Sequence, residues 1–332
     1  MKPIYSFLLI SMILFISSCA EKQSSSDPLS LWNDTPMKSK IISFVQNEVP
    51  KIPVEDRIAT FDLDGTLACE KPLWFEMYCA VEGLCLQVEK DPKLLDRTIY
   101  QYAKKLKANP ADTSVTNHWG PVIDTMVDSA YYGWDNEAYV AFSNRYLGKT
   151  VNPDYKVILN RTFYPPMLQL LNYLKANQFE VYVVSGSLQG LLWGVCPEAI
   201  GFDRKHLIGS RQAMSFTYHE GGKAMFTLLP QNYEPKNNNN GKAIDIYTFI
   251  GKAPVFAFGN TTGDFGMFKI TTSNSLPNEC FLLNHNNRQR EYAYSPGYSA
   301  DTIGWRDTMQ VYGWNIVDMK ENFSVVFEGK EQ

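Results

Sequence analysis

Two aspartates, Asp62 and Asp64, stand in the hexapeptide FDLDGT at residues 61–66. Carboxylates at this spacing can attack an electrophile, exchange protons with a substrate or bind a hard cation. Aspartate is also common in turns, so the pair alone is weak evidence for a site. An apolar, β-compatible run over residues 58–63 contains the first aspartate, and a Gly-Thr turn signal follows the second. The motif therefore predicts two carboxylates at the end of a buried strand.

Further apolar runs along the chain also read as strands, namely residues 179–184, 255–258 and 280–283. A helical pattern over residues 165–176 precedes the second strand, and another that begins near Lys242 precedes the third. Continuous apolar strands that alternate with helices predict an α/β fold, in which a parallel sheet is covered by helices on both faces.

Polar side chains follow the ends of these predicted strands. Asp62, Ser185 and the pair Asn260 and Asp264 each lie at or just after such an end. Ligands bind beyond the carboxyl ends of the strands in sheets of this kind. We therefore expect these residues to meet in one site, although they are far apart in the sequence.

The first two predicted strands are separated by over a hundred residues, too many for one crossover connection. Helical patterning covers three parts of this interval: residues 72–82, 92–107 and 136–147. We interpret residues 70–160 as a helical cap inserted into a core made of residues 36–69 and 161–332. The aromatic stretch at residues 131–134 is typical of core packing, and ligand contact is the second interpretation.

The order of these segments resembles the haloacid dehalogenase-like superfamily, whose members have a Rossmann-like parallel sheet and a cap. The resemblance spans residues 57–290 and is close at four short segments. It implies that Asp62 is the nucleophile and Asp64 the general acid and base. A carboxylate can form an acyl phosphate, while the second acid protonates the leaving alkoxide and later deprotonates water.

The resemblance also implies the groups that hold the phosphate. Ser185, with Gly186 beside it, matches the phosphate-binding hydroxyl, and Lys242 matches the lysine that neutralises both phosphate and nucleophile. Lys223 and Lys236 are rivals for this role, and order and spacing favour Lys242. Taken alone, Ser185 would be read as a turn or cap residue.

Residues 258–264 resemble the acidic metal motif of this superfamily and imply Mg²⁺ held by Asp62, Asp64, Asn260 and Asp264. Asn260 departs from the pattern, because an aspartate usually stands there. An amide oxygen is a hard ligand without charge, so we expect weaker metal binding unless Asp264 ligates directly. The departure supports an alternative function, a catalytically weak or inactive lipoprotein that binds a phosphorylated ligand.

Residues 66–72 resemble the phosphoserine phosphatase-like and phosphorylcholine phosphatase-like branches. This implies a magnesium-dependent phosphatase for a small phosphorylated metabolite, with amine-bearing esters as one class and Glu70 as the ammonium contact. A carboxylate at the start of a helix near Pro72 is an equal interpretation of Glu70. Retention of Asp64 favours phosphate hydrolysis over dehalogenation, and a cation pump would need several membrane spans.

The N-terminus has the pattern of an export signal, with Lys2 followed by an apolar run over residues 5–16 and small residues before Cys19. The last residues of this pattern resemble the bacterial lipobox, which implies a lipoprotein signal over residues 1–19, lipid on Cys19 and a tether over residues 20–35. An ordinary secretory signal is the alternative. We expect a membrane-anchored protein of the bacterial cell envelope, facing the periplasm or the exterior.

The 332 residues carry a formal charge of -4, which indicates no basic face for nucleic acid and leaves a small phosphate ester as the expected partner. Besides Cys19, five cysteines occur without the spacing or histidine company of a zinc site. We interpret them as small buried apolar residues. A disulfide between Cys79 and Cys85 is the alternative, and the sequence gives no oligomeric state.

Overall fold

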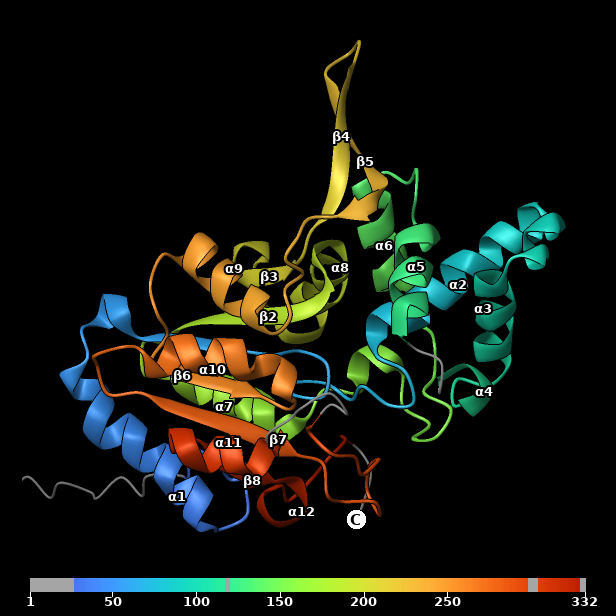
Figure 1. Ribbon diagram of the computed structural model, residues 1–332. Coiled ribbons are helices and arrows are strands. Elements are labelled where there is room, and N and C mark those ends of the chain that lie inside the picture. The colour runs from blue at the N-terminus through green and yellow to red at the C-terminus, as the bar shows by residue number, and fades with distance from the viewer. Residues whose placement is uncertain (1–26, 117–119, 298–303, 329–332) are drawn as a thin grey trace, which may run out of the picture.

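The computed structural model describes residues 27–116, 120–297 and 304–328 (Figure 1). The predicted signal, Cys19 and the first part of the predicted tether lie outside the described residues. Among the described residues, every helix is too short or too polar to cross a membrane.

The described residues form a six-stranded sheet in the order β3-β2-β1-β6-β7-β8, and every neighbouring pair is parallel. The strands are β1 (Ile58–Phe61), β2 (Glu180–Leu188), β3 (Leu207–Ser210), β6 (Phe256–Gly259), β7 (Glu279–Asn284) and β8 (Asn315–Asp318). The predicted α/β fold with a parallel sheet is thereby confirmed. β3 and β8, at the two edges of the sheet, were not predicted.

Alternate side chains of each strand enter two separate apolar cores, as the two-residue period of a strand requires. In β6, Phe256 and Phe258 pack into one core and Ala257 into the other. The first core is covered by α1 (Pro36–Ser43), α7 (Pro165–Ala176) and α8 (Gln189–Ile200). The second is covered by α9 (Asn240–Ile250), α10 (Phe265–Thr272) and α11 (Trp305–Tyr312), and α12 (Met319–Asn322) follows β8.

Between β1 and α7 the chain forms a group of helices beside the sheet (Figure 1). They are α2 (Phe75–Lys90), α3 (Thr98–Ala108), α4 (Thr113–Thr116), α5 (Gly120–Ala130) and α6 (Asn136–Leu147). Gly190 and Gly194 lie on one face of α8 and let α6 approach closely. A Cβ atom on Gly194 would lie 2.3 Å from the hydroxyl oxygen of Ser143, and one on Gly190 would lie 2.7 Å from the ring of Tyr139.

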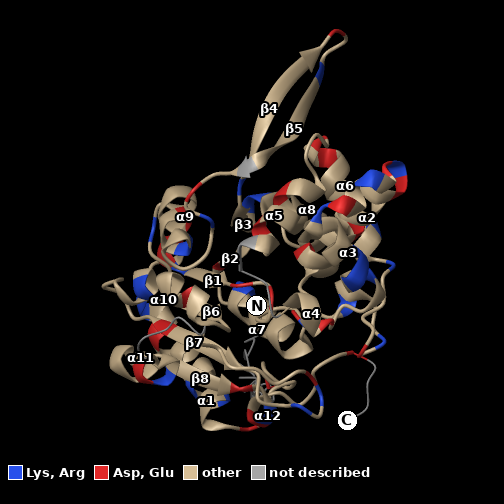
Figure 2. Cartoon of the chain, turned by 45° about the vertical axis from the view of Figure 1, so that its right-hand side comes forward, with Lys and Arg blue, Asp and Glu red and all other residues tan. Residues whose placement is uncertain are grey.

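A second excursion from the core is the antiparallel hairpin of β4 (Gln212–His219) and β5 (Lys223–Asn232). It projects from the molecule, and its strands carry few charged residues (Figure 2). Its base joins the helical group, because the backbone N–H of Leu228 donates to the carbonyl of Trp134 over 2.8 Å. The sequence analysis missed this hairpin, and its exposed apolar residues, such as Phe216, explain why no burial pattern marked it.

The asparagine run at residues 237–240 leads into α9, and its last three residues are exposed. Asn237 is fully buried, and its side-chain amide donates to the carbonyl of Ile208 within β3. A buried amide with a backbone partner fixes one end of a loop, so Asn237 ties the segment before α9 to β3. The five cysteines after residue 27 are all buried and free, Cys79 and Cys85 included.

Candidate active site

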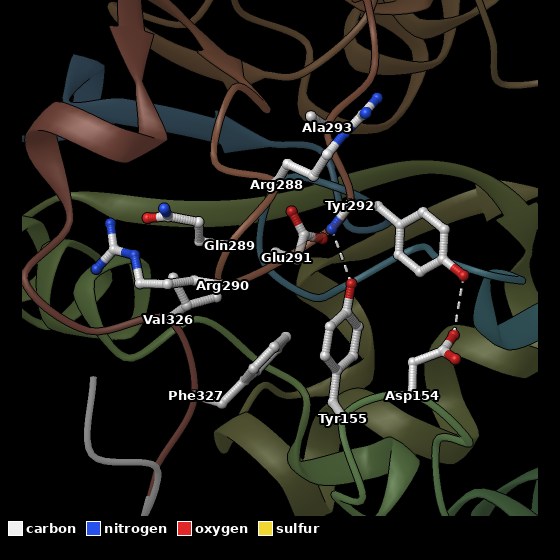
Figure 3. A pocket seen from close by; sticks show the side chains of 10 residues that line it. All are labelled: Asp154, Tyr155, Arg288, Gln289, Arg290, Glu291, Tyr292, Ala293, Val326 and Phe327. Atoms are coloured by element: carbon white, nitrogen blue, oxygen red, sulfur yellow. Dashed lines mark hydrogen bonds between the residues drawn. The ribbon is translucent and has the colours of Figure 1, made fainter.

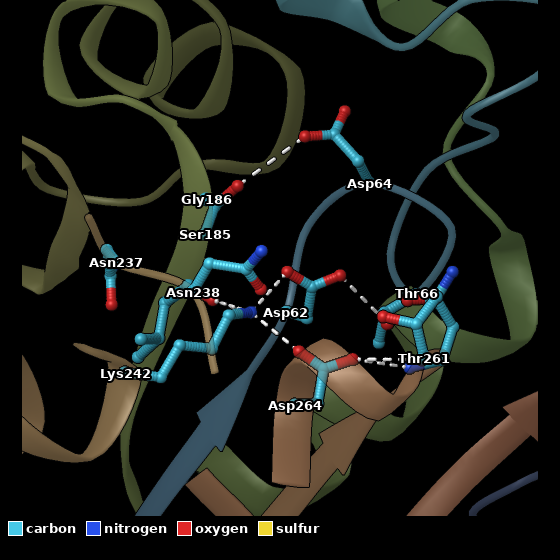
Figure 4. Close-up of polar contacts among 12 residues, drawn as sticks. Asp62, Asp64, Thr66, Ser185, Gly186, Asn237, Asn238, Lys242, Thr261 and Asp264 are labelled. Atoms are coloured by element: carbon cyan, nitrogen blue, oxygen red, sulfur yellow. Dashed lines mark hydrogen bonds and ion pairs between the residues drawn. The ribbon is translucent and has the colours of Figure 1, made fainter. Parts of the chain in front are cut away.

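The centre of the site is a buried cation between two carboxylates (Figure 4). The ammonium of Lys242, in the first turn of α9, lies 2.6 Å from Oδ1 of Asp62 and 2.6 Å from Oδ1 of Asp264. It also donates to the carbonyl of Val184 over 2.7 Å. Asp62 follows β1 directly, and its backbone N–H donates to the carbonyl of Phe258 in β6 over 2.9 Å.

This group carries more negative than positive charge. Burial lowers the pKa of Lys242, and the carboxylates of Asp264 and Asp62 more than offset it, so the lysine stays protonated. Burial raises the pKa of Asp62 and the lysine opposes this rise. One ammonium facing two carboxylates leaves a local negative charge, which disfavours a phosphate anion unless a further cation is present.

Asp64 lies beside two serines of β2. Its Oδ2 accepts from the Ser187 hydroxyl at 2.8 Å and from the Ser185 hydroxyl at 3.4 Å. Its Oδ1 is buried with no hydrogen-bond partner among the described residues. Burial raises the pKa of Asp64 to about 6, so this carboxyl can hold or release a proton near neutral pH.

Ser187 was missed by the sequence analysis, which selected Ser185 and Gly186. Ser185 and Ser187 are both buried and Gly186 between them is exposed, so the two hydroxyls lie on the same side of β2. The Ser185 hydroxyl oxygen also accepts from the backbone N–H of Ser187 over 3.1 Å. The Ser-Gly-Ser spacing is the sequence signal that identifies both hydroxyls, because residues two apart in a strand share a face.

The buried side chain of His285 hydrogen-bonds to the turn after Asp64. Gly65 has a positive φ of 79°, which favours glycine, and its carbonyl accepts from Nε2 of His285 at 2.7 Å. Nδ1 of His285 lies 2.6 Å from the carboxylate of Glu291. Burial lowers the pKa of His285 and Glu291 more than offsets it, so both ring nitrogens donate. No local signal marked His285 as part of the site, because the carbonyl of Gly65 that it contacts lies 220 positions away in the chain.

Asn260 begins the turn after β6 and faces three other polar groups. Its backbone N–H donates to Oδ2 of Asp264 over 2.9 Å. Its side-chain Nδ2 lies 3.3 Å from Oε1 of Glu70 and 3.2 Å from the hydroxyl of Tyr294. Glu70 therefore lies at the site and outside the first turn of α2, which begins at Phe75.

The donor atoms around Asp62 fit a hard divalent cation. Among the described residues, no three His, Cys, Asp or Glu side chains converge as a metal centre. Asp62, the Oδ1 of Asp64, which is unpartnered in the described part of the chain, and the amide oxygen of Asn260 are instead hard oxygen donors of the kind that Mg²⁺ prefers, and Glu70 adds a carboxylate beside Asn260. Both oxygens of Asp264 already accept, one from Lys242 and the other from the backbone N–H of Asn260. Asp264 thus positions the lysine and the turn.

The two other candidate lysines lie elsewhere. Lys223 is exposed at the start of β5, where it pairs in register with His219 at the tip of the hairpin. The ammonium of Lys236 lies 2.7 Å from the carboxylate of Asp124 on the surface. Lys242 is the lysine that the fold brings to Asp62.

A further acid, Glu76, was also missed. It lies in the first turn of α2 and is buried, and its Oε1 accepts from the backbone N–H of Leu188 at 2.7 Å. Burial raises the pKa of Glu76 to about 8. This side chain joins the helical group to the end of β2, so it ties that group to the strand that carries the two serines.

A cavity of about 720 Å³ is lined by residues 288–293, with Asp154 and Tyr155 and with Val326 and Phe327 (Figure 3). Its wall includes Tyr155, Arg288, Tyr292 and Glu291, and none of the aspartates at the ends of β1 and β6. The guanidinium of Arg290 donates to the carbonyl of Phe323 over 2.9 Å, so it fixes the C-terminal segment. The convergent polar side chains at the strand ends, and not this cavity, define the candidate active site.

Several solved structures are similar to this chain. A protein of unknown function from Anaerococcus prevotii is 14% identical, with 76% of this chain and 86% of that one covered and a TM-score of 0.49. One of unknown function from Bordetella pertussis is 13% identical, with coverage of 79% and 98% and a TM-score of 0.48. A phosphoserine phosphohydrolase-like protein from Francisella tularensis is 14% identical, with coverage of 70% and 90% and a TM-score of 0.37.

No curated protein sequence matches the chain. The sequence pattern of the haloacid dehalogenase-like hydrolases matches residues 59–269, which include both aspartates after β1, the serines of β2, Lys242 and Asp264. The chain therefore belongs to the haloacid dehalogenase-like hydrolase family.

Proposed function

We propose that this protein is a magnesium-dependent phosphomonoester hydrolase that works through an aspartyl-phosphate intermediate. The observation that carries the proposal is the position of Asp62, at the end of β1, with Lys242 at 2.6 Å and the second acid Asp64 in the same turn. A nucleophile, a proton carrier and a fixed cation are the groups that phosphoryl transfer to a carboxylate needs.

The reaction proceeds in two displacements. An oxygen of Asp62 attacks phosphorus, the bond from phosphorus to the ester oxygen breaks, and Asp64 gives its proton to the leaving alkoxide. Water then attacks the same phosphorus, Asp64 takes a proton from it, and the bond to the Asp62 oxygen breaks to release phosphate. A carboxyl whose pKa is raised to about 6 suits both proton transfers.

The remaining groups hold the phosphate and the cation. Ser185 donates to a phosphate oxygen, the exposed backbone of Gly186 lies beside it, and Lys242 offsets charge on the nucleophile. Asp62 and Asn260 would hold Mg²⁺, whose charge neutralises the phosphate oxygens when it is bound. The resemblance of residues 66–72 to the phosphoserine phosphatase-like and phosphorylcholine phosphatase-like branches supports small phosphorylated metabolites, amine-bearing esters among them, as the substrates.

We further propose that the protein is exported and held in the bacterial cell envelope by lipid on Cys19. The sequence of residues 1–19 supports this, and phosphate scavenging from external esters fits such a place. Incorporation of a labelled fatty acid into the wild type and its absence in Cys19→Ala would support the anchor. Equal labelling of the two proteins would overturn it.

Phosphate release by the full-length chain in detergent tests the activity. We expect release from p-nitrophenyl phosphate with Mg²⁺, none with a chelator, and none from Asp62→Asn. Phosphoserine and phosphocholine are compared with an ester of similar size that lacks an amine. A folded wild type that releases no more phosphate than Asp62→Asn would favour the second candidate, a lipoprotein that binds phosphorylated ligands, which the uncharged Asn260 supports.

A further inference from the structure

The uncharged residue of the metal motif has a carboxylate next to it. Asn260 is 1% exposed, and its Nδ2 lies 3.3 Å from Oε1 of Glu70. The two residues are 190 positions apart in the chain, so the contact is a product of the fold. The negative charge that an aspartate would bring at position 260 is present at the same place, on a different residue.

The same contacts fix which way the Asn260 amide points. Nδ2 is directed at two oxygen atoms, those of Glu70 and of the Tyr294 hydroxyl, at 3.3 Å and 3.2 Å. An amide whose NH₂ group donates to these partners turns its carbonyl oxygen away from them. Tyr294 is itself held, because its ring stacks on His285 with 4.4 Å between ring centroids and 17° between planes.

The ion pair of Glu70 with Lys71 leaves much of the charge of Glu70 available. The Lys71 ammonium lies 4.0 Å from Oε1 of Glu70, and its side chain is 34% exposed, whereas that of Glu70 is 16% exposed. A lysine at this distance, with its side chain partly in water, offsets only part of the charge of the carboxylate. Lys71 also lies over the Tyr294 ring, 4.8 Å from its centroid, so it is shared between two neighbours.

We propose that Glu70 supplies the negative charge of the cation site that Asn260 lacks, and that Glu70 and Tyr294 hold the Asn260 amide with its carbonyl oxygen toward the cation. Glu70 and Tyr294 are then positioning residues for a divalent cation bound by Asp62 and Asn260. This inference rests on the proposed magnesium-dependent function. It assigns Glu70 to the metal and not to the ammonium group of a substrate.

Direct binding of Mn²⁺, measured by electron paramagnetic resonance with the full-length chain in detergent, tests the proposal without turnover. We expect Glu70→Gln to weaken Mn²⁺ binding by about tenfold or more, as loss of an outer partner of a metal ligand commonly does. Tyr294→Phe keeps the ring stack and loses the hydroxyl, so a smaller loss, roughly threefold, is expected. Glu89→Gln removes an exposed carboxylate of α2 and is the matched control.

A further experiment exchanges the carboxylate and the amide of positions 70 and 260. Asn260→Asp alone places a second carboxylate against Glu70, and like charges in contact should weaken folding without metal. Asn260→Asp combined with Glu70→Gln returns one carboxylate and one amide to the same place. We expect this double variant to bind Mn²⁺ within about threefold of the wild type. The effects of the two neighbouring substitutions are then not additive, because the second restores the charge that the first removes.

The outcomes separate this inference from the proposed function. Wild-type protein that binds no Mn²⁺ and shows no metal-dependent activity would overturn both. Wild-type binding that Glu70→Gln leaves unchanged, in a variant with normal circular dichroism, would overturn the inference alone. A Glu70→Gln variant with normal Mn²⁺ affinity and a raised KM for amine-bearing esters only would place Glu70 on the substrate instead.

Discussion

The ammonium of Lys242 and the carboxylate of Asp62 lie 2.6 Å apart although 180 residues separate them in the chain. The lysine comes from the first turn of α9 and the aspartate from the end of β1. Because Lys242 also meets Asp264 at 2.6 Å, one buried cation holds the ends of β1 and β6 together. The same contact holds Asp62, the proposed nucleophile, in place.

Removal of this cation should therefore affect stability and activity together. We expect Lys242→Gln to lower the free energy of unfolding by ~3–5 kcal/mol, because it leaves two buried carboxylates without the cation that they share. Phosphate release should fall at least about a hundredfold, since the nucleophile loses its fixed neighbour. Chemical denaturation and p-nitrophenyl phosphate assays measure the two effects.

Lys252→Gln is the control for this change, because its partner Asp56 is also at 2.6 Å but the side chains are 47% and 31% exposed. Such a pair is worth at most about 1 kcal/mol. A Lys242→Gln protein as stable and active as this control would contradict the role given to Lys242.

Gly65 should tolerate no side chain. Its φ is +79°, and a Cβ atom would lie 1.8 Å from Nδ2 of Asn260. We expect Gly65→Ala to displace Asn260, to destabilise by more than the ~1–2 kcal/mol of a left-handed alanine, and to remove most metal-dependent activity. Thermal unfolding with and without Mg²⁺ measures both effects.

Gly133→Ala separates backbone strain from crowding. Gly133 has a φ of +80°, and a Cβ atom there would meet nothing within 4 Å. This variant should lose about 1–2 kcal/mol of stability and keep its activity. If Gly65→Ala and Gly133→Ala behave alike, crowding of Asn260 by a side chain at position 65 does not affect the activity.

The two serines of β2 should differ in their kinetic effect. Ser187 donates to Asp64 over 2.8 Å, so Ser187→Ala should lower kcat about tenfold while KM changes little. Ser185 is the proposed phosphate contact and lies at 3.4 Å from the same oxygen, so Ser185→Ala should raise KM. Steady-state kinetics of the two variants give the comparison. The reverse assignment would follow if Ser187→Ala raised KM alone.

Glu76 should make stability depend on pH. Burial raises its pKa from 4.5 to about 8, so the folded protein holds a proton that the unfolded chain has released. The contribution of this proton to the free energy of unfolding is complete below pH 4.5. It is lost as pH rises toward 8, at about 1.4 kcal/mol per pH unit. Glu76→Gln keeps an oxygen for the Leu188 N–H and cannot ionise.

The measurement is the unfolding temperature of wild type and Glu76→Gln between pH 5 and about pH 8. We expect the unfolding temperature of Glu76→Gln to rise relative to that of the wild type as pH rises through this window. Glu89→Gln, in the exposed last turn of α2, should follow the wild-type curve. Parallel curves for Glu76→Gln and wild type would show that Glu76 is not buried as a neutral acid.

The sequence by itself determined the fold class, most central strands and the family. The helix predicted over residues 165–176 has the bounds of α7, and the four predicted strands match β1, β2, β6 and β7 within a few residues. These elements carry their signal locally, because apolar runs and turn residues reflect burial of neighbouring positions. Strands in a parallel sheet also place their ends on one edge, which is why the motif residues could be grouped.

Only the tertiary structure decided which groups touch. The contacts of His285 with Gly65 and of Glu70 with Asn260 join residues 220 and 190 positions apart. Burial of Asn237 and Glu76 depends on neighbours from other segments, and the hairpin of β4 and β5 carries no burial pattern of its own. A hydrogen bond depends on distance and direction in space, and the sequence records these only through the packing of the whole chain.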